Sequence, residues 1–282
     1  MKEPVSITGL SDIIDKYDAF FLDQFGVLHD GQRPYPDVVA TLEKLHDANK
    51  KIIILTNSGK RSQPNLQRLI KMGFPELVIS HVISSGEVAW RGIKVGSFGL
   101  PFVSGKNAFI IGKDGDDYNL DDLNLKFVNV PQEADFLLIM GSNSPETSLA
   151  EYHTMLASAA QKNIPALCAN PDKMMITSSG LQPAPGAIAE VYSKLGGKVR
   201  FIGKPFADIY KLALVTSNDI EINRVIAVGD SVEHDIIGAA NVGIASVLVR
   251  TGVSASCFAE ELRGVFAREN VWPNFVIPRF KW

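Results

Sequence analysis

Residues 19–28 read AFFLDQFGVL, and this stretch decides the fold. Its first four residues are apolar, a pattern that is typical of a short strand buried on both faces. Asp23 ends the apolar run and opens a loop that contains Phe25 and Gly26. A carboxylate at the end of such a strand lies where open α/β sheets bind their ligands. Asp23 is therefore a candidate functional residue, although a lone Asp could instead cap the next turn.

The composition is that of an ordinary soluble globular protein. The chain has 282 residues, of which 46% are hydrophobic and 21% charged, and this length suits two domains. The net charge of −3 and the scattered basic residues give no electrostatic footprint for nucleic acid or for an anionic membrane. Two cysteines, Cys168 and Cys257, cannot form a disulfide framework and suggest a reducing compartment.

No apolar run approaches the ~20 residues of a membrane span, and the N-terminus has no apolar core of a signal peptide. We therefore expect a cytoplasmic protein that binds neither nucleic acid nor membrane.

Short β-rich runs alternate with amphipathic stretches, which predicts βαβ units around a parallel sheet. The expected strands are 19–22, 51–55, 136–140, 199–202, 224–228 and 245–249. An apolar stripe of Val38, Leu42 and Leu45 predicts a helix after the first strand, and a second helix is expected at about 63–72.

The middle of the chain differs in texture from its two ends. It is richer in Gly, Pro and Ser turns from about residue 96, and strong strand–loop motifs resume only near Lys204. We therefore predict a core made of residues 1–95 and 198–282, with a second α/β module, residues 96–197, inserted into it.

Two further loops that follow β-like runs carry residues suited to an oxyanion. Thr56, Asn57 and Ser58 offer small hydroxyl and amide side chains at a strand-to-helix turn, where free backbone N–H groups also face an anion. These residues could instead cap the following helix. Lys204 follows the run 199–202 and could neutralise phosphate charge, or it could be a solvated surface charge.

A fourth loop, residues 229–235, carries two carboxylates after the strand at 224–228. Asp230 and Asp235 bracket the strand end and the first turn of the next helix. Oxygen ligands on a rigid turn suit Mg²⁺. Asp235 could instead cap the helix, and His234 is interpreted as a solvated helix residue rather than a ligand.

The four loops in this order resemble the four motifs of the haloacid dehalogenase (HAD) superfamily, from Asp23 to Gly243. The position of the insert, between the second and third motifs, resembles the class II cap arrangement. The strings ANPD at 169–172 and PGAI at 185–188 look like the cap and hinge signatures of the NagD-like, class IIA sugar and nucleotide phosphatases. The resemblance implies a Rossmann-like α/β core, with a parallel sheet and helices on both faces, and an inserted α/β cap of the C2 type.

The resemblance also implies a mechanism. Asp23 would be the nucleophile that attacks phosphorus and forms an aspartyl-phosphate. Mg²⁺ would be held by Asp23, by the backbone carbonyl of Phe25 and by Asp230, with support from Asp235. The transferring phosphate would be bound by Thr56, Asn57, Ser58 and Lys204, of which Lys204 is also a catalytic residue. Asn170 and Asp172 lie where a cap would reach the leaving group, or they shape a turn.

The chain departs from this pattern at Phe25. Family phosphatases have a second Asp there, which serves as general acid and base and is worth roughly 10²–10⁴ in rate. A substitute acid could come from His29, from Asp30 or from the cap. Otherwise the enzyme would act slowly, or only on good leaving groups such as acyl or aryl phosphates.

We therefore predict a Mg²⁺-dependent phosphatase that hydrolyses a small phosphomonoester, a sugar phosphate or a nucleotide, through Asp23. The alternatives are a catalytically impaired phosphate-binding protein and a dehalogenase-type hydrolase. Family dehalogenases also carry an aromatic residue two positions after the nucleophile, but they need no metal, whereas Asp230 and Asp235 retain the metal motif. The expected partners are a small-molecule phosphate ester and a second copy of the chain bound through the cap.

Overall fold

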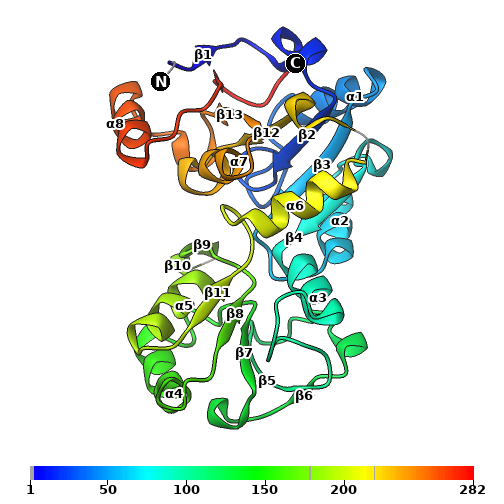
Figure 1. Ribbon diagram of the computed structural model, residues 1–282. Coiled ribbons are helices and arrows are strands. Elements are labelled where there is room, and N and C mark those ends of the chain that lie inside the picture. The colour runs from blue at the N-terminus through cyan, green and yellow to red at the C-terminus, as the bar shows by residue number, and fades with distance from the viewer. Residues whose placement is uncertain (1–2, 178, 219) are drawn as a thin grey trace. The chain divides into compact units, whose positions relative to one another are not determined.

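The computed structural model describes residues 3–177, 179–218 and 220–282 (Figure 1). The chain forms two compact units and passes from one to the other four times. The first unit comprises Met1–Thr56, Gln63–Ile83 and Lys204–Trp282, and the second comprises Asn57–Ser62 and Ser84–Gly203. No helix in the described ranges is both long and apolar enough to cross a membrane.

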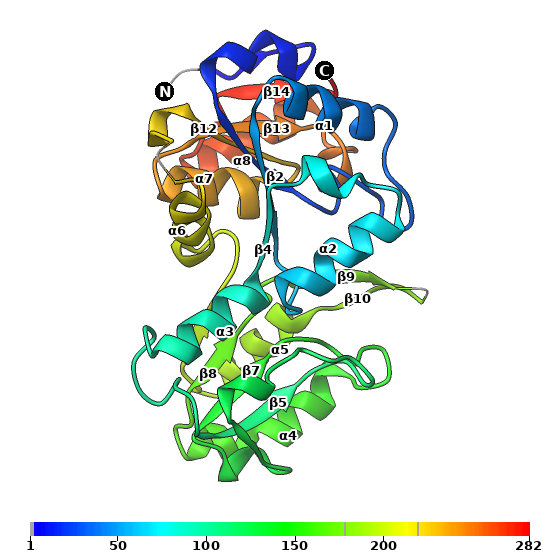
Figure 2. The ribbon, with the colours of Figure 1, turned by 90° about the vertical axis from the view of Figure 1, so that its right-hand side faces the viewer.

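A seven-stranded sheet forms the centre of the first unit, in the order β1-β14-β13-β12-β2-β3-β4 (Figure 2). Its strands are β1 (Val5–Ser6), β2 (Ala19–Asp23), β3 (Lys51–Thr56), β4 (His81–Ser84), β12 (Val225–Gly229), β13 (Ala245–Val249) and β14 (Phe275–Ile277). From β2 the chain continues outward through β3 and β4, and from its neighbour β12 it continues in the opposite direction through β13 and β14. Open α/β sheets bind ligands beyond the carboxyl ends of their strands at such a switch point.

Helices cover both faces of this sheet (Figure 2). They are α1 (Val38–Asp47), α2 (Ser62–Lys71), α6 (Ala207–Thr216), α7 (Ile237–Asn241) and α8 (Ala259–Glu269). Successive residues of a strand face opposite sides, and β13 follows this rule. Val247 packs in the core that includes Leu42 of α1, whereas Leu248 packs with Phe266 of α8. The predicted α/β fold, with a parallel sheet and helices on both faces, is confirmed.

The second unit has its own five-stranded parallel sheet, in the order β11-β8-β7-β5-β6. Its strands are β5 (Asn107–Ile111), β6 (Lys126–Phe127), β7 (Phe136–Ile139), β8 (Ala166–Cys168) and β11 (Val199–Phe201), and an antiparallel ribbon pairs β9 (Met174–Thr177) with β10 (Gly180–Pro183). The helices are α3 (Ser85–Val95), α4 (Leu149–Gln161) and α5 (Pro185–Lys194). Leu137 of β7 packs with Leu156 of α4 and Ile188 of α5 in a separate hydrophobic core.

The second unit extends beyond the predicted insert at 96–197. It also contains residues 57–62, 84–95 and 198–203, which the sequence analysis assigned to the core. Residues 199–201 belong to it because β11 pairs with β8, and two close contacts tie the other segments to the insert. A Cβ on Gly92 of α3 would lie 2.0 Å from the Phe98 ring, and a Cβ on Gly59 would lie 2.0 Å from the carbonyl oxygen of Met140. Glycine at these two positions lets both segments pack against the insert.

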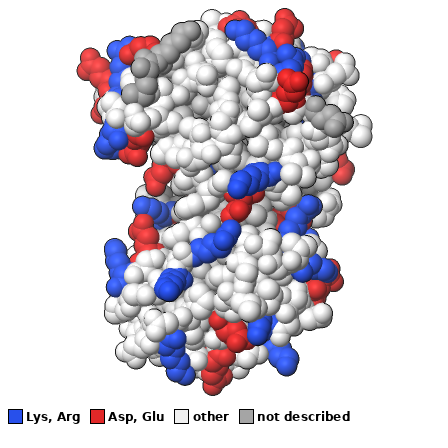
Figure 3. Space-filling view, in the orientation of Figure 1, with Lys and Arg blue, Asp and Glu red and all other residues white. Residues whose placement is uncertain are grey.

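Acidic and basic side chains alternate over the face of the molecule drawn in Figure 3. Among the described residues on this face, Lys and Arg do not gather into an extended patch of one sign. Mixed charge of this kind is typical of a solvated protein surface.

Candidate active site

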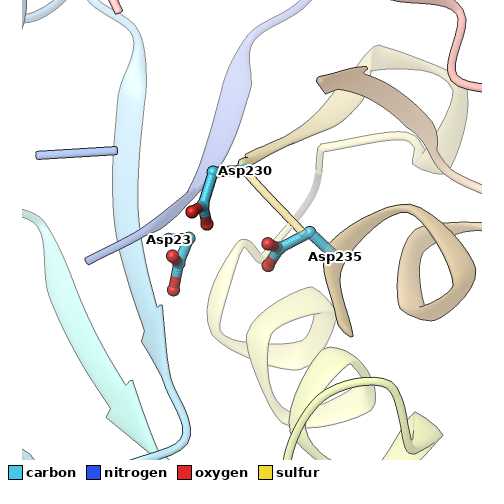
Figure 4. Close-up of side chains that lie close together, drawn as sticks. All are labelled: Asp23, Asp230 and Asp235. Carbon is cyan, nitrogen blue, oxygen red and sulfur yellow. The ribbon is translucent and has the colours of Figure 1, made fainter. Parts of the chain in front are cut away.

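Three carboxylates converge at the carboxyl end of the first unit's sheet (Figure 4). Asp23, Asp230 and Asp235 each offer one oxygen, and these three atoms lie within 4.8 Å of one another. Asp23 ends β2 and Asp230 directly follows β12, which pairs with β2 so that Leu22 lies opposite Val228. The sheet itself therefore brings together two acids that are far apart in the sequence.

Lys204 supplies the positive charge of this cluster. Its ammonium donates to Oδ1 of Asp23 and, at 2.7 Å, to Oδ1 of Asp235. The side chain is only 4% exposed, so Lys204 is not a solvated surface charge. Burial would lower the pKa of Lys204, but the two carboxylates raise it well above its usual value. Lys204 therefore carries a positive charge at neutral pH.

The cluster holds more acid than base, and the pKa values reflect this. Burial raises the pKa of Asp23 to about 6; Lys204 opposes that rise and the charge of Asp235 adds to it. Burial, followed by the charges of Asp23 and Asp235, raises the pKa of Asp230 to about 9. Adjacent carboxylates that share a buried site hold protons or a cation, because their charges repel. An oxygen-rich, negatively charged set of this kind fits a hard divalent cation.

Asp230 lies in a cradle that only glycine can form. A Cβ on Gly26 would lie 2.2 Å from Oδ2 of Asp230, and one on Gly252 would lie 1.8 Å from the same atom. Both glycines have positive φ, +90° and +52°. The backbone N–H of Val253 donates to Oδ2 at 2.7 Å, and the Ser254 hydroxyl donates to the Asp230 carbonyl at 2.5 Å. These contacts fix the orientation of the Asp230 carboxylate.

The segment after β13 that makes this cradle was missed by the sequence analysis. Thr251 and Gly252 follow a predicted strand, and the Thr251 hydroxyl donates to the Gly26 carbonyl at 2.5 Å. The available signal was a hydroxyl residue and a glycine at a strand end, as at Thr56 and Gly59.

Asp235 is held from two sides within a wide π-helical turn, Val232–Ile236. A Cβ on Gly229 would lie 2.1 Å from Cγ of Asp235, and the backbone N–H of Ser231 donates to Oδ2 at 3.1 Å. Ser231 is the helix cap, because its hydroxyl accepts from the N–H of His234 at 3.2 Å. Asp235 thus bonds to the backbone of the cap residue through Oδ2, while its Oδ1 accepts from Lys204 in the acidic cluster.

Phe25 occupies the position where a second acid was expected from the resemblance. Its side chain has no proton to give, and the residue is 43% exposed. The ring packs edge-on against the His29 ring, with centroids 6.1 Å apart, and a Cβ on Gly31 would lie 3.1 Å from it.

The two substitutes that the same loop offers are poor proton donors in this geometry. His29 is 1% exposed, its Nδ1 accepts from the N–H of Gly31 at 2.9 Å, and burial lowers its pKa to about 4. The Asp30 carboxylate accepts from two backbone N–H groups of its own turn, which lower its pKa. His29 is therefore neutral and enclosed, and Asp30 is ionised and engaged in a turn.

The remaining candidate residues divide between the units. Thr56 ends β3 in the first unit, one residue beyond Leu55, which lies opposite Asp23. Asn57 belongs to the second unit, where its amide donates to Oδ1 of Asp172 at 2.7 Å.

The other two candidates in the second unit are held in local turns. Asn170 accepts from the N–H of Asp172 at 3.1 Å through Oδ1, which is the geometry of a turn. The Ser58 hydroxyl accepts from the N–H of Lys60 at 3.3 Å. The described contacts of Asn170 and Ser58 are thus structural, and a role in binding phosphate or a leaving group stays a prediction.

Two family models match the chain. The first, haloacid dehalogenase-like hydrolase, covers residues 20–126, and the second, a HAD-hydrolase-like model, covers residues 201–281. Together they contain Asp23, Lys204, Asp230 and Asp235. The chain belongs to the HAD superfamily.

This HAD hydrolase is similar to curated proteins and to solved structures over most of its length. It is 26% identical over 255 residues to chronophin from Bos taurus, covering 87% of this chain and 85% of the relative. It is 25% identical over 267 residues to a 4-nitrophenylphosphatase from Schizosaccharomyces pombe, covering 86% and 87%. A HAD-like hydrolase structure from Brucella suis 1330 superimposes with a TM-score of 0.82 at 26% identity, covering 97% and 99%. The predicted resemblance to the class IIA HAD phosphatases is confirmed.

Proposed function

We propose that this protein is a Mg²⁺-dependent phosphatase that transfers the phosphoryl group of a small phosphomonoester to Asp23. The observation that carries the proposal is the buried cluster in which Asp23, Asp230 and Asp235 converge and Lys204 bonds to two of them. A nucleophilic carboxylate, a fixed cation and an oxygen-rich cation site are the parts that this chemistry requires.

The residues present fit a divalent cation. Asp23 and Asp230 would hold it, with support from Asp235, and the carbonyl of Phe25 is the further ligand that the family pattern implies. Burial and mutual repulsion raise the pKa values of Asp23 and Asp230, and a dication would relieve that repulsion. When bound, Mg²⁺ would neutralise and align the phosphoryl oxygens.

The chain's own residues would carry the reaction as follows. A carboxylate oxygen of Asp23 forms a bond to phosphorus, and the ester P–O bond breaks, with its electron pair leaving on the alcohol oxygen. Lys204 holds Oδ1 of Asp23, which orients the carboxylate and places a positive charge beside the transferring group. Water then attacks the phosphorus of the aspartyl-phosphate, and the P–O bond to Asp23 breaks with its electron pair returning to the carboxylate. One proton of the water stays on the inorganic phosphate, and the other goes to solvent, which supplies the proton of the alcohol. Thr56, Asn57 and Ser58 are proposed to bind the phosphate.

Phe25 bears on the choice of substrate. A hydrocarbon side chain at this position cannot protonate a departing alkoxide, and neither His29 nor Asp30 is placed to do so. This favours esters with stable leaving groups over simple alkyl esters, and it keeps a weakly active phosphate-binding protein as the second candidate. A sugar phosphate or nucleotide as substrate, a cytoplasmic location and a homodimer formed through the cap stay predictions.

The test is phosphate release from p-nitrophenyl phosphate, acetyl phosphate, sugar phosphates and nucleotides, with Mg²⁺ or with EDTA. We expect turnover that requires Mg²⁺ and that falls by about 10⁴-fold or more in Asp23→Asn, because the nucleophile is lost. The matched control is Asp15→Asn, which removes an exposed carboxylate near the same strand and should keep full activity.

Two results would contradict the proposal. One is full metal-dependent activity in Asp23→Asn. The other is release of halide from haloacids in EDTA, which would point to the dehalogenase reaction instead. Mg²⁺ binding without turnover of any ester would favour the binding protein.

A further inference from the structure

Tyr210 is a buried residue that the mechanism above does not use. It lies on α6, in the second turn after Lys204, and is 1% exposed. Its hydroxyl is 3.3 Å from the carbonyl oxygens of both His234 and Asp235. Both carbonyls belong to the π-helical turn Val232–Ile236 that carries Asp235 into the acidic cluster.

This turn is an irregular part of its helix. A π turn is rare and occurs mostly as a single turn within an α-helix, often at a functional site. The turn Val232–Ile236 runs directly into α7 at Ile237, and the Tyr210 hydroxyl reaches the carbonyls at this junction. The hydroxyl is the donor in these contacts, because a carbonyl oxygen can only accept.

The surrounding backbone leaves room for this contact. Gly238, in the first turn of α7, lies against the Tyr210 ring, and a Cβ there would be 2.5 Å from the hydroxyl oxygen. A side chain at this position would push the hydroxyl away from the two carbonyls.

We propose that Tyr210 is a positioning residue that holds the wide turn in place, and thereby aims the Asp235 carboxylate at Lys204 and at the cation site. Two of the three groups that orient Asp235 are already known from the geometry, namely Ser231 and Lys204. Tyr210 is the third, and it acts on the backbone rather than on the carboxylate. The consequence for metal affinity rests on the Mg²⁺ site of the proposed function.

The test compares Tyr210→Phe with Tyr192→Phe. Tyr192 is equally buried, and its hydroxyl also donates to a backbone carbonyl, that of Ile164, but in the core of the second unit. Each variant removes one buried hydroxyl, so both should lose similar stability. Only Tyr210→Phe should weaken Mg²⁺ binding, by about tenfold in isothermal titration calorimetry, as is typical when an outer partner of a metal ligand is removed.

A second measurement does not depend on the metal. Hydrogen exchange of the metal-free protein should be faster at amides 231–241 in Tyr210→Phe, and unchanged there in Tyr192→Phe. Gly238→Ala should reproduce the effect of Tyr210→Phe, because the new methyl group displaces the hydroxyl.

The outcomes separate this proposal from the proposed function. Unchanged exchange at 231–241 in Tyr210→Phe, or an equal loss of Mg²⁺ affinity in Tyr192→Phe, would overturn the positioning role. If the wild-type protein binds no Mg²⁺, the proposed function fails in that respect, and the exchange result alone decides the role of Tyr210.

Discussion

Replacing Phe25 by Asp should convert a site without a general acid into one that has it. The change lies two residues after Asp23, at a position where 43% of the residue surface is already exposed. The family pattern places the general acid and base at this position, so an Asp at position 25 would restore the group that protonates a leaving alkoxide. A protonated carboxyl is the group that a departing alkoxide needs.

The structure sets the size of the two opposing effects. Fully burying a Phe side chain is worth about 1.5–3 kcal/mol, so losing the half-buried ring should cost about 1–1.5 kcal/mol of folding free energy. That loss is small beside the usual stability of about 5–15 kcal/mol, and the variant should fold. A positioned acid is worth roughly 10²–10⁴ in rate, or about 3–5 kcal/mol of activation free energy.

The assay is kcat/KM for an alkyl phosphate, such as a sugar phosphate, and for p-nitrophenyl phosphate, both with saturating Mg²⁺. We expect Phe25→Asp to raise kcat/KM for the alkyl ester by roughly 10²–10⁴. The same change should raise kcat/KM for the nitrophenyl ester only slightly, because that leaving group needs no proton. Phe25→Asn is the matched control, since it has the same shape and loses the same ring but cannot supply the proton.

An equal effect of Phe25→Asp and Phe25→Asn on the alkyl ester, with both variants folded and metal-bound, would refute this reasoning. So would a wild-type enzyme that hydrolyses alkyl and nitrophenyl esters equally fast, because a proton donor would then already be present.

Two further predictions concern the cation site. Gly252→Ala should weaken Mg²⁺ binding by about 10–100-fold in calorimetry, because its Cβ would lie 1.8 Å from Oδ2 of Asp230 and displace that carboxylate. The control is Gly243→Ala, which is also at positive φ but has no atom within 4 Å of its Cβ, and this variant should bind Mg²⁺ normally. Equal losses of Mg²⁺ affinity in the two variants would contradict the role of the glycine cradle. In EDTA, the free energy of unfolding should fall as the pH rises from about 4 towards 9. The folded protein keeps the Asp230 proton up to a pKa of about 9, whereas the unfolded chain releases it near 3.8. Urea titrations at several pH values measure this dependence of the unfolding free energy on pH, and saturating Mg²⁺ should remove most of it. A metal-free unfolding free energy that rises with pH over this range would show that Asp230 is ionised in the folded protein.

Much of the fold and part of the site could be predicted from local sequence patterns. All six expected strands are present with ends within one residue of the prediction, because buried parallel strands are short apolar runs bounded by turn residues. Asp23, Lys204, Asp230 and Asp235 could be named in advance because each follows an apolar run or lies in the next turn. For Asp23 and Asp230 the reason they meet is also local, because positions after neighbouring parallel strands lie at one edge of the sheet. Lys204 follows β11 of the other sheet, so its place in the cluster comes from the tertiary structure.

Contacts between distant segments lay outside the reach of those patterns. The second unit also takes in 57–62, and the close approach of Gly59 to Met140 within it joins segments far apart in the sequence, which no local pattern reports. The pairing of Asn57 with Asp172 has the same origin, since the two residues are far apart in the sequence. His29 could be proposed as an acid from the sequence, but its burial and lowered pKa exist only in the folded chain.

The sequence by itself determined the chemistry available to this protein: a carboxylate after the first core strand, a lysine and two acids after later strands, and a phenylalanine in place of an acid. The tertiary structure alone decided how those groups are held, through the glycine cradle of Asp230, the wide turn of Asp235 and the hydroxyl of Tyr210. The physical reason is that residue identity fixes which atoms can donate, accept or attack. Burial, pKa and orientation arise only when segments distant in the sequence exclude water from one another.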